Sequence, residues 1–420
     1  MSRSGLIFRP VPRTGVIYVM TEAAALGFRY GHPEWQNLGQ GAPETGPLPG
    51  SAARLREIAL DDASHEYAPV AGLWELREAV AGLYNARYRR GMKGRYSAEN
   101  VAIAAGGRAS LTRVATALGN VHLGHLLPDY TAYEELLEVF RAFVPIPIVL
   151  RPEDGFRLAP ARLRETIVGA GLGAILLSNP QNPTGHRIAG EELRAWVQMS
   201  REFGCALILD EFYAHYVYGE AEGATASACA FVESIEEDPV VVVDGLTKNW
   251  RYPGLRISWT VGPKEVIERV SSAGSFLDGG PPHGVQRAVI PMLDPAHAAQ
   301  ETVAIQRAFT AKRGLMLEKL EAMGIGVPCP PEGAFYCFAD LSGLPAPLAN
   351  GMDFFRAALA ERVICVPGEF FDVDPGKRRS HIPSRLRSFV RLSFGPSEGE
   401  VRAGLDRLAG LVARARAAAG

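Results

Sequence analysis

The chain has 420 residues, of which 47% are hydrophobic and 21% are charged, the usual balance of a globular protein. This length is too great for one simple core, so we expect two domains or one large α/β unit. The formal net charge of −2 gives no reason to expect nucleic acid or an acidic membrane surface as a partner. The N-terminus lacks the apolar core of a secretion signal, and no run reaches the roughly 20 apolar residues that span a bilayer. We therefore expect a cytoplasmic protein without a membrane segment.

The cysteines are spread along the chain, at Cys205, Cys229, Cys329, Cys337 and Cys365. Their number is odd and no pair has CxxC spacing, which predicts neither a disulfide framework nor a zinc site. Several lie in apolar runs, as reduced thiols of a protein core do. We expect no metal centre.

The first part of the chain is rich in proline and glycine. Residues 1 to about 50 are therefore predicted to be irregular. Gly39 and Gly41 allow the backbone to approach a ligand closely, although an ordinary turn explains them equally well. Residues 51–60 predict a short helix, and residues 67–77 predict a loop that leads into an amphipathic helix ending near Arg90.

A glycine pair follows the apolar strand predicted at residues 101–105. Gly106 and Gly107 open a helix, so free backbone N–H groups and the positive helix end point at one spot, which suits a phosphate. Arg108 adds a charged contact. This turn is common and the signal alone is weak. The segment lacks both the GxGxxG and the GxxxxGK[ST] pattern, which argues against a dinucleotide or P-loop site.

Further polar side chains follow predicted strands. Tyr130 lies after one strand, and Asn182 lies in a loop whose two Asn-Pro steps force extended backbone. Asp210 ends the run Ala206–Leu209, where burying an unpaired carboxylate would be costly. Lys248 follows the run Pro239–Val243. A lysine taken alone would be read as a surface residue. Its convergence with these side chains at one sheet edge indicates a ligand site with a desolvated, nucleophilic amine.

Strand–helix–strand units recur through residues 51–305, which predicts a large α/β domain with a mostly parallel sheet sandwiched by helices. From about residue 308 the pattern changes to a long helix ending near residue 323. Strands at 330–340 and 388–394, a helix at 353–362 and a closing helix then follow. We expect residues 1–50 and 306–420 to form a smaller α+β domain.

Taken together, these segments resemble the class I/II aminotransferases, which are fold-type I enzymes dependent on pyridoxal 5′-phosphate (PLP). The stretch 179–185, the pair Asp210 and Tyr213, and the pair Lys248 and Arg256 are similar to three motifs of that family in their order. Residues 67–73 and 390–394 match two further segments. The resemblance covers nearly the whole chain, and five motifs in order are specific.

The resemblance implies a role for each matching residue. Lys248 would form the aldimine with PLP and then act as general base. Asp210 would pair with the pyridine nitrogen, while Tyr213 and Asn182 would hydrogen-bond the phenolic oxygen. The substrate carboxylate would bind Arg391, with Gly41 and Asn182 beside it.

The resemblance also implies how the rest of the cofactor is held. Tyr130 would stack on the ring. The phosphate would be held by Gly106, Gly107, Arg108, Thr247 and Arg256. Tyr67 would reach the phosphate of the neighbouring subunit, so a homodimer with shared sites is expected.

The chain departs from the family pattern in several places. Gly245 stands where the family often has a phosphate-binding serine, and Arg108 stands where smaller or uncharged residues are usual. No arginine lies between Ser271 and Gln286, which argues against a pocket dedicated to aspartate or glutamate. One hypothesis is that Asp278 faces the side-chain pocket and favours a polar or basic amino acid. The other interpretation, which the loop position favours, is that Asp278 caps its own loop.

The resemblance implies a PLP-dependent aminotransferase that exchanges an amino group between an L-amino acid and a 2-oxo acid by a ping-pong mechanism. The alternative is a PLP-dependent lyase, cyclase or oxidative deaminase, because the motifs that bind PLP are common to all of these enzymes. A non-catalytic PLP-binding regulator would need a DNA-binding module, for which the residues before the first motif leave no room.

Overall fold

The computed structural model describes residues 11, 13, 15–140 and 142–419. Its centre is a seven-stranded sheet with the strand order β2-β8-β7-β6-β5-β3-β4. The bounds are β2 (Val101–Ala104), β3 (His122–Leu127), β4 (Val144–Val149), β5 (Leu172–Ser178), β6 (Ala206–Asp210), β7 (Val240–Gly245) and β8 (Ser258–Val261). Only β8 runs antiparallel to its neighbours. The predicted α/β fold with a mostly parallel sheet is confirmed.

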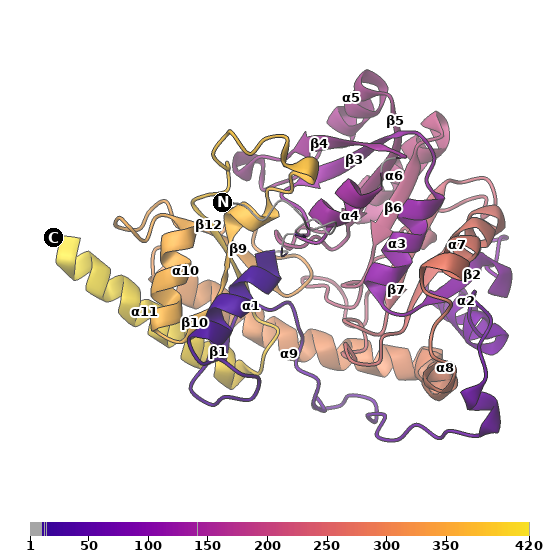
Figure 1. Ribbon diagram of the computed structural model, residues 1–420, viewed down its shortest axis with the longest axis horizontal. Helices are drawn as coiled ribbons and strands as arrows, with labels where there is room; N and C mark the ends of the chain where they lie inside the picture. Colours follow the sequence, from indigo (N-terminus) through magenta and orange to yellow (C-terminus); the bar gives the residue numbers. More distant parts are fainter. Residues whose placement is uncertain (1–10, 12, 14, 141, 420) are drawn as a thin grey trace, which may run out of the picture.

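Helices pack against this sheet (Figure 1). Helix α3 (Gly107–Ala117) contacts β2, β7 and β8 and packs against α7 (Lys264–Leu277). Helix α5 (Pro160–Ala170) packs against α6 (Gly190–Phe203), which contacts β6. Helix α2 (Trp74–Tyr88) contacts β2, α4 (Tyr133–Val139) packs against α3, and α8 (His283–Val289) packs against α2. The helices keep water from the central strands, so β7 is buried along its whole length, as a parallel strand covered on both faces should be.

A second group of elements lies beside the large sheet (Figure 1). An antiparallel sheet has the order β11 (Val366–Pro367), β12 (Phe389–Ser393) and β9 (Tyr336–Asp340). A short parallel pair joins β1 (Gln36–Asn37) to β10 (Val363–Ile364). The helices here are α1 (Gly15–Ala25), α10 (Gly351–Ala360) and α11 (Glu398–Ala419). Helix α9 (Pro295–Ala322) runs without a break through the boundary predicted at residue 305, and the division into two domains stays a prediction.

Three local predictions are wrong. The first 50 residues contain helix α1, because the prolines that argued against a helix all lie outside it and Val19 and Ala23 are fully buried. The helix predicted to start near residue 308 begins at Pro295, where the Asp294 side chain caps it. Residues 51–60 are not helical. There the Leu55 N–H donates to the Tyr252 hydroxyl at 2.7 Å instead of to its own chain one turn back.

No helix in the described ranges combines the length and the apolar content needed to cross a membrane.

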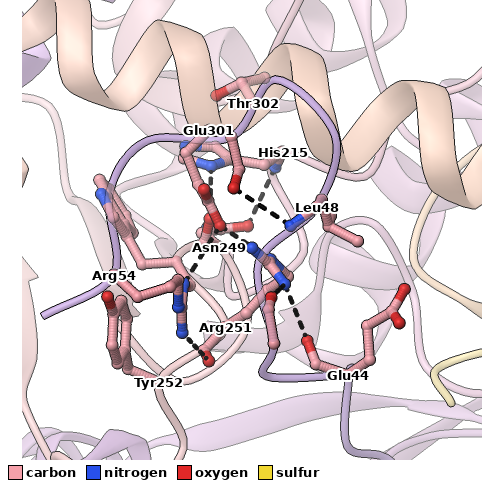
Figure 2. A network of polar contacts seen from close by, with 12 residues as sticks. Glu44, Leu48, Arg54, His215, Asn249, Arg251, Tyr252, Glu301 and Thr302 are labelled. Carbon is pink, nitrogen blue, oxygen red and sulfur yellow. Dashed lines mark hydrogen bonds and ion pairs between the residues drawn. The ribbon is translucent and has the colours of Figure 1, made fainter. Parts of the chain in front are cut away.

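A buried network of charges fixes the turn that follows Lys248 (Figure 2). The Arg251 backbone has a φ of +58° and its side chain is fully buried. Its guanidinium donates to Glu301 of α9 at 2.8 Å and to the carbonyl oxygens of Glu44 and Gly46 at 3.0 and 2.6 Å. Arg54 donates to the carbonyls of Trp250 and Arg251 at 2.9 and 2.8 Å. The N-terminal segment, the Lys248 turn and α9 are thereby held together.

We predict that Glu301→Ala lowers the free energy of unfolding by about 3–5 kcal/mol, because it leaves the Arg251 cation buried without its partner. Urea unfolding followed by circular dichroism measures this change. The control is Glu398→Ala, which breaks an exposed pair with Arg402 and should cost less than about 1 kcal/mol. Equal losses in the two variants would show that the buried network does not stabilise the fold.

Candidate active site

A cavity of about 420 Å³ lies at the C-terminal edge of the central sheet. Ser178 and Asp210 line it from the last positions of β5 and β6, and Lys248 lines it from the turn after β7. Tyr336 of β9 and Arg391 of β12 close it from the small antiparallel sheet. Of the residues predicted from the sequence, the following line this cavity: Gly41, Gly107, Arg108, Tyr130, Asn182, Asp210, Tyr213, Thr247, Lys248, Arg256 and Arg391.

The Lys248 amine lies inside this cavity and donates to the carbonyl oxygen of Gly41. Burial, reinforced by the positive charges of Arg391 and Arg108, lowers the pKa of Lys248 to about 7. The Asp210 carboxylate opposes this shift but does not cancel it. A large fraction of the amine is therefore uncharged, and nucleophilic, near neutral pH.

Asp210 is buried at the end of β6 and accepts a hydrogen bond from the Tyr133 hydroxyl at 3.0 Å. Burial raises the pKa of Asp210 to about 6, against the opposing effect of the Tyr133 hydrogen bond. No ion pair to this carboxylate is found among the described residues. A buried carboxylate in this position is suited to a cationic ligand atom, such as a protonated ring nitrogen.

Arg391 is buried and its guanidinium is only partly satisfied. It donates to Asn182 Oδ1 at 2.9 Å and to the Gly39 carbonyl at 2.5 Å, and its buried Nε has no hydrogen-bond partner among the residues that the structure describes. The guanidinium lies 4.3 Å from the centre of the Tyr336 ring and 5.0 Å from that of Phe371. Within the described part of the chain no carboxylate pairs with Arg391, so this buried cation is suited to the carboxylate of a ligand.

The glycine pair forms a close-packed cradle at the start of α3. Gly106 caps the helix with a φ of +92°, and a Cβ there would lie 2.0 Å from Nη2 of Arg256. A Cβ at Gly107 would lie 2.7 Å from the Phe212 ring. Only glycine fits at these two positions, which leaves the helix N-terminus open toward the cavity.

Two hydroxyl-bearing residues complete this end of the cavity. The Thr247 hydroxyl is buried and has no hydrogen-bond partner within the described residues. The Tyr130 hydroxyl accepts a hydrogen bond from Arg108 at 3.2 Å. The structure also explains why position 245 is glycine and not the serine often found in the family. A Cβ at Gly245 would lie 2.6 Å from the Ile257 carbonyl oxygen. Thr247 is therefore the nearby hydroxyl that a phosphate can use.

Tyr67 does not belong to the cavity of its own chain, since its side chain is 97% exposed. Its predicted contact with a neighbouring subunit stays a prediction.

Of the two interpretations of Asp278, the structure supports the loop cap, and Asp278 does not line the cavity of its own chain. Asp278 follows the last residue of α7, and both of its carboxylate oxygens accept hydrogen bonds from Arg113, whose side chain is buried. It also caps its own loop by accepting the Gly280 N–H at 3.0 Å. Although burial opposes it, the Arg113 hydrogen bond lowers the pKa of Asp278. The carboxylate compensates the buried Arg113 cation and does not line the cavity.

Tyr336 is a cavity residue that the sequence analysis did not identify. Its hydroxyl lies 2.8 Å from the Tyr213 hydroxyl. The sequence shows Tyr336 only as part of an apolar strand. Its place in the site depends on how β9 pairs with β12, where Tyr336 lies opposite Ser393.

No group of three or more His, Cys, Asp or Glu side chains in the described ranges is arranged to hold a metal ion. All the cysteines are buried and unpaired.

Comparison with known proteins places this geometry in a family. The family model described as aminotransferase class I and II matches residues 33–408. The aspartate/prephenate aminotransferase of Thermus thermophilus is 30% identical over 403 residues, which are 94% of this chain and 96% of that protein. The valine–pyruvate aminotransferase of Mycobacterium tuberculosis is 28% identical over 90% of this chain and 91% of that protein.

Solved structures of aminotransferases have the same fold as this chain. The Thermus thermophilus aspartate aminotransferase with maleate superposes with a TM-score of 0.77 at 26% identity, covering 96% of this chain and 100% of that chain. An aminotransferase from Mycobacterium tuberculosis gives the same TM-score at 26% identity, covering 96% and 97%. The family match spans all three sheets and every motif on which the resemblance was based, and the predicted family is confirmed: the chain belongs to the class I and II aminotransferases.

Proposed function

We propose that this aminotransferase exchanges an amino group between an L-amino acid and a 2-oxo acid, with PLP held at Lys248. The observation that carries the proposal is the meeting, in one cavity, of a lysine whose pKa is about 7, a buried carboxylate at Asp210 and a buried cation at Arg391. A nucleophile, a group for a ring nitrogen and a group for a substrate carboxylate are the parts that this reaction needs.

The residues of the cavity fit PLP. The phosphate would be held by the N-terminus of α3 at Gly106 and Gly107, by the unpaired Thr247 hydroxyl and by Arg256, with Arg108 nearby. Asp210 would bind the protonated ring nitrogen. Tyr213 and Asn182 would donate to the phenolic oxygen, since Asn182 uses its Oδ1 for Arg391 and its side-chain NH₂ donates to no other described residue. Tyr130 would lie against the ring.

The same side chains account for the chemistry. When bound, PLP supplies the aldehyde carbon that carries the amino group and a ring that accepts the electrons released at the substrate Cα. Asp210 keeps the proton on the ring nitrogen. Arg391 and Asn182 orient the substrate through its carboxylate, beside Gly41. The Lys248 amine would move the proton between the substrate Cα and C4′ of the cofactor, which its pKa of about 7 permits near neutral pH.

Single-turnover absorbance spectroscopy tests the proposal. The PLP-loaded enzyme is mixed with a panel of L-amino acids that includes aspartate and valine, because relatives are named for these donors. We predict that at least one donor replaces the visible band with that of the pyridoxamine form, and that a 2-oxo acid restores it. Lys248→Ala should slow the change by about 10²–10⁴-fold or more, because the general base is lost.

Ammonia release without accumulation of the pyridoxamine form would contradict transamination and favour a lyase or a deaminase. Failure of the wild-type protein to bind PLP would contradict the site itself.

We also propose that two copies form a homodimer in which Tyr67 reaches the phosphate bound by the partner. Tyr67 is 97% exposed. Two large apolar residues, Leu60 and Phe276, are 64% and 72% exposed. Exposed apolar side chains of this size are suited to a protein interface.

Light scattering should give twice the chain mass of 45.3 kDa. Tyr67→Phe should weaken PLP binding about 10–100-fold, the effect of losing one hydrogen bond to a charged group, and leave the mass unchanged. Tyr30→Phe, at another exposed tyrosine, is the control. A monomer, or unchanged PLP affinity in Tyr67→Phe, would contradict the shared site.

A further inference from the structure

Tyr336 connects the two halves of the cavity. It lies on β9, is fully buried, and its hydroxyl lies 2.8 Å from that of Tyr213. On the other side its ring faces the Arg391 guanidinium at 4.3 Å. It is the side chain that contacts both the group assigned to the cofactor's phenolic oxygen and the group assigned to the substrate carboxylate.

The direction of the tyrosine–tyrosine hydrogen bond follows from proton counting. Each hydroxyl has one proton to donate. Burial raises the pKa of Tyr213 well above its usual value and that of Tyr336 to about 12, so both hydroxyls are protonated near neutral pH. If Tyr213 gives its proton to the phenolic oxygen, it can only accept from Tyr336. A donor that is itself hydrogen-bonded in this way is polarised and strengthened.

The Tyr336 hydroxyl is held in place by close packing. A Cβ at Gly41 would lie 2.3 Å from its oxygen, so glycine is needed there. The Gly41 carbonyl in turn accepts the hydrogen bond from Lys248. The hydroxyl therefore lies close to both the Gly41 backbone and the Tyr213 hydroxyl.

We propose that Tyr336 is a positioning residue, whose hydroxyl donates to Tyr213 and so directs the Tyr213 proton to the phenolic oxygen of the cofactor. The inference rests on the proposed function. It assigns Tyr336 an effect on the cofactor's protonation that is exerted through Tyr213, while its ring supports Arg391 independently of the hydroxyl.

The pH titration of the visible absorbance of the PLP-loaded enzyme tests this proposal. A donor at the phenolic oxygen stabilises negative charge, which is greatest in the deprotonated chromophore, so weakening the donor raises the pH midpoint. Tyr336→Phe should raise the midpoint by about half a unit, the size expected for one hydrogen bond, and Tyr213→Phe should raise it further. The double variant should match Tyr213→Phe alone.

Two additional variants make the test specific. Tyr218→Phe removes another buried hydroxyl, which donates to the Ala334 carbonyl outside the cavity lining, and should leave the midpoint unchanged. Site-specific 3-fluorotyrosine at position 336 is a stronger donor that keeps the fold, and should lower the midpoint. Because Tyr336→Phe keeps the ring beside Arg391, the KM for the amino donor should stay within about twofold.

The proposal is overturned if neither variant at position 336 moves the midpoint, or if Tyr336→Phe moves it equally in the Tyr213→Phe background. If the wild-type protein shows no PLP chromophore, both the proposed function and this inference are contradicted. If the chromophore is normal but its pH midpoint does not change in the variants at position 336, only the inference is contradicted.

Discussion

The site depends on keeping the Lys248 amine away from bulk water and beside other positive charges. In water an ammonium is stable at neutral pH, and such a lysine would be neither nucleophile nor base. Burial together with the charges of Arg391 and Arg108 brings the pKa of Lys248 to about 7. The same two arginines are the groups suited to anionic parts of the ligands. The charges that attract the ligands thus also prepare the amine that reacts.

The fold maintains this arrangement through the turn between β7 and β8. The Asn249 amide donates to the Asp244 carboxyl at 2.8 Å and to the Glu211 carbonyl at 3.0 Å, which closes the turn around Lys248. Burial raises the pKa of Asp244 well above its usual value. The ion pair between Arg251 and Glu301 also connects this turn to α9 (Figure 2). A parallel sheet brings the strand ends together, and these buried contacts fix the lysine among them.

Part of the site follows from local sequence, because some of its residues lie at or just after the end of an apolar strand, and parallel strand ends meet at one edge. Asp210, Asn182 and Lys248 are predictable in this way, and the motifs add Arg391. Tyr336 was missed because its place depends on the pairing of β9 with β12.

The errors elsewhere have similar causes. The pairing of Asp278 with Arg113 was not predicted, because the two residues are 165 positions apart in sequence. Residues 51–60 do not form the expected helix, because Arg54 and Leu55 form hydrogen bonds with the turn at residues 250–252. Local helix propensity does not indicate these long-range contacts.

The central claim is that a neutral Lys248 amine binds the cofactor aldehyde near pH 7. The most direct measurement incubates the cofactor-free enzyme briefly with PLP at a series of pH values, reduces the mixture with borohydride, and quantifies the labelled peptide by mass spectrometry. We predict that the label lies on Lys248, rises through about pH 7 and levels off above it, since only the uncharged amine reacts. Labelling at another lysine, or a rise delayed until near pH 10, would contradict the account.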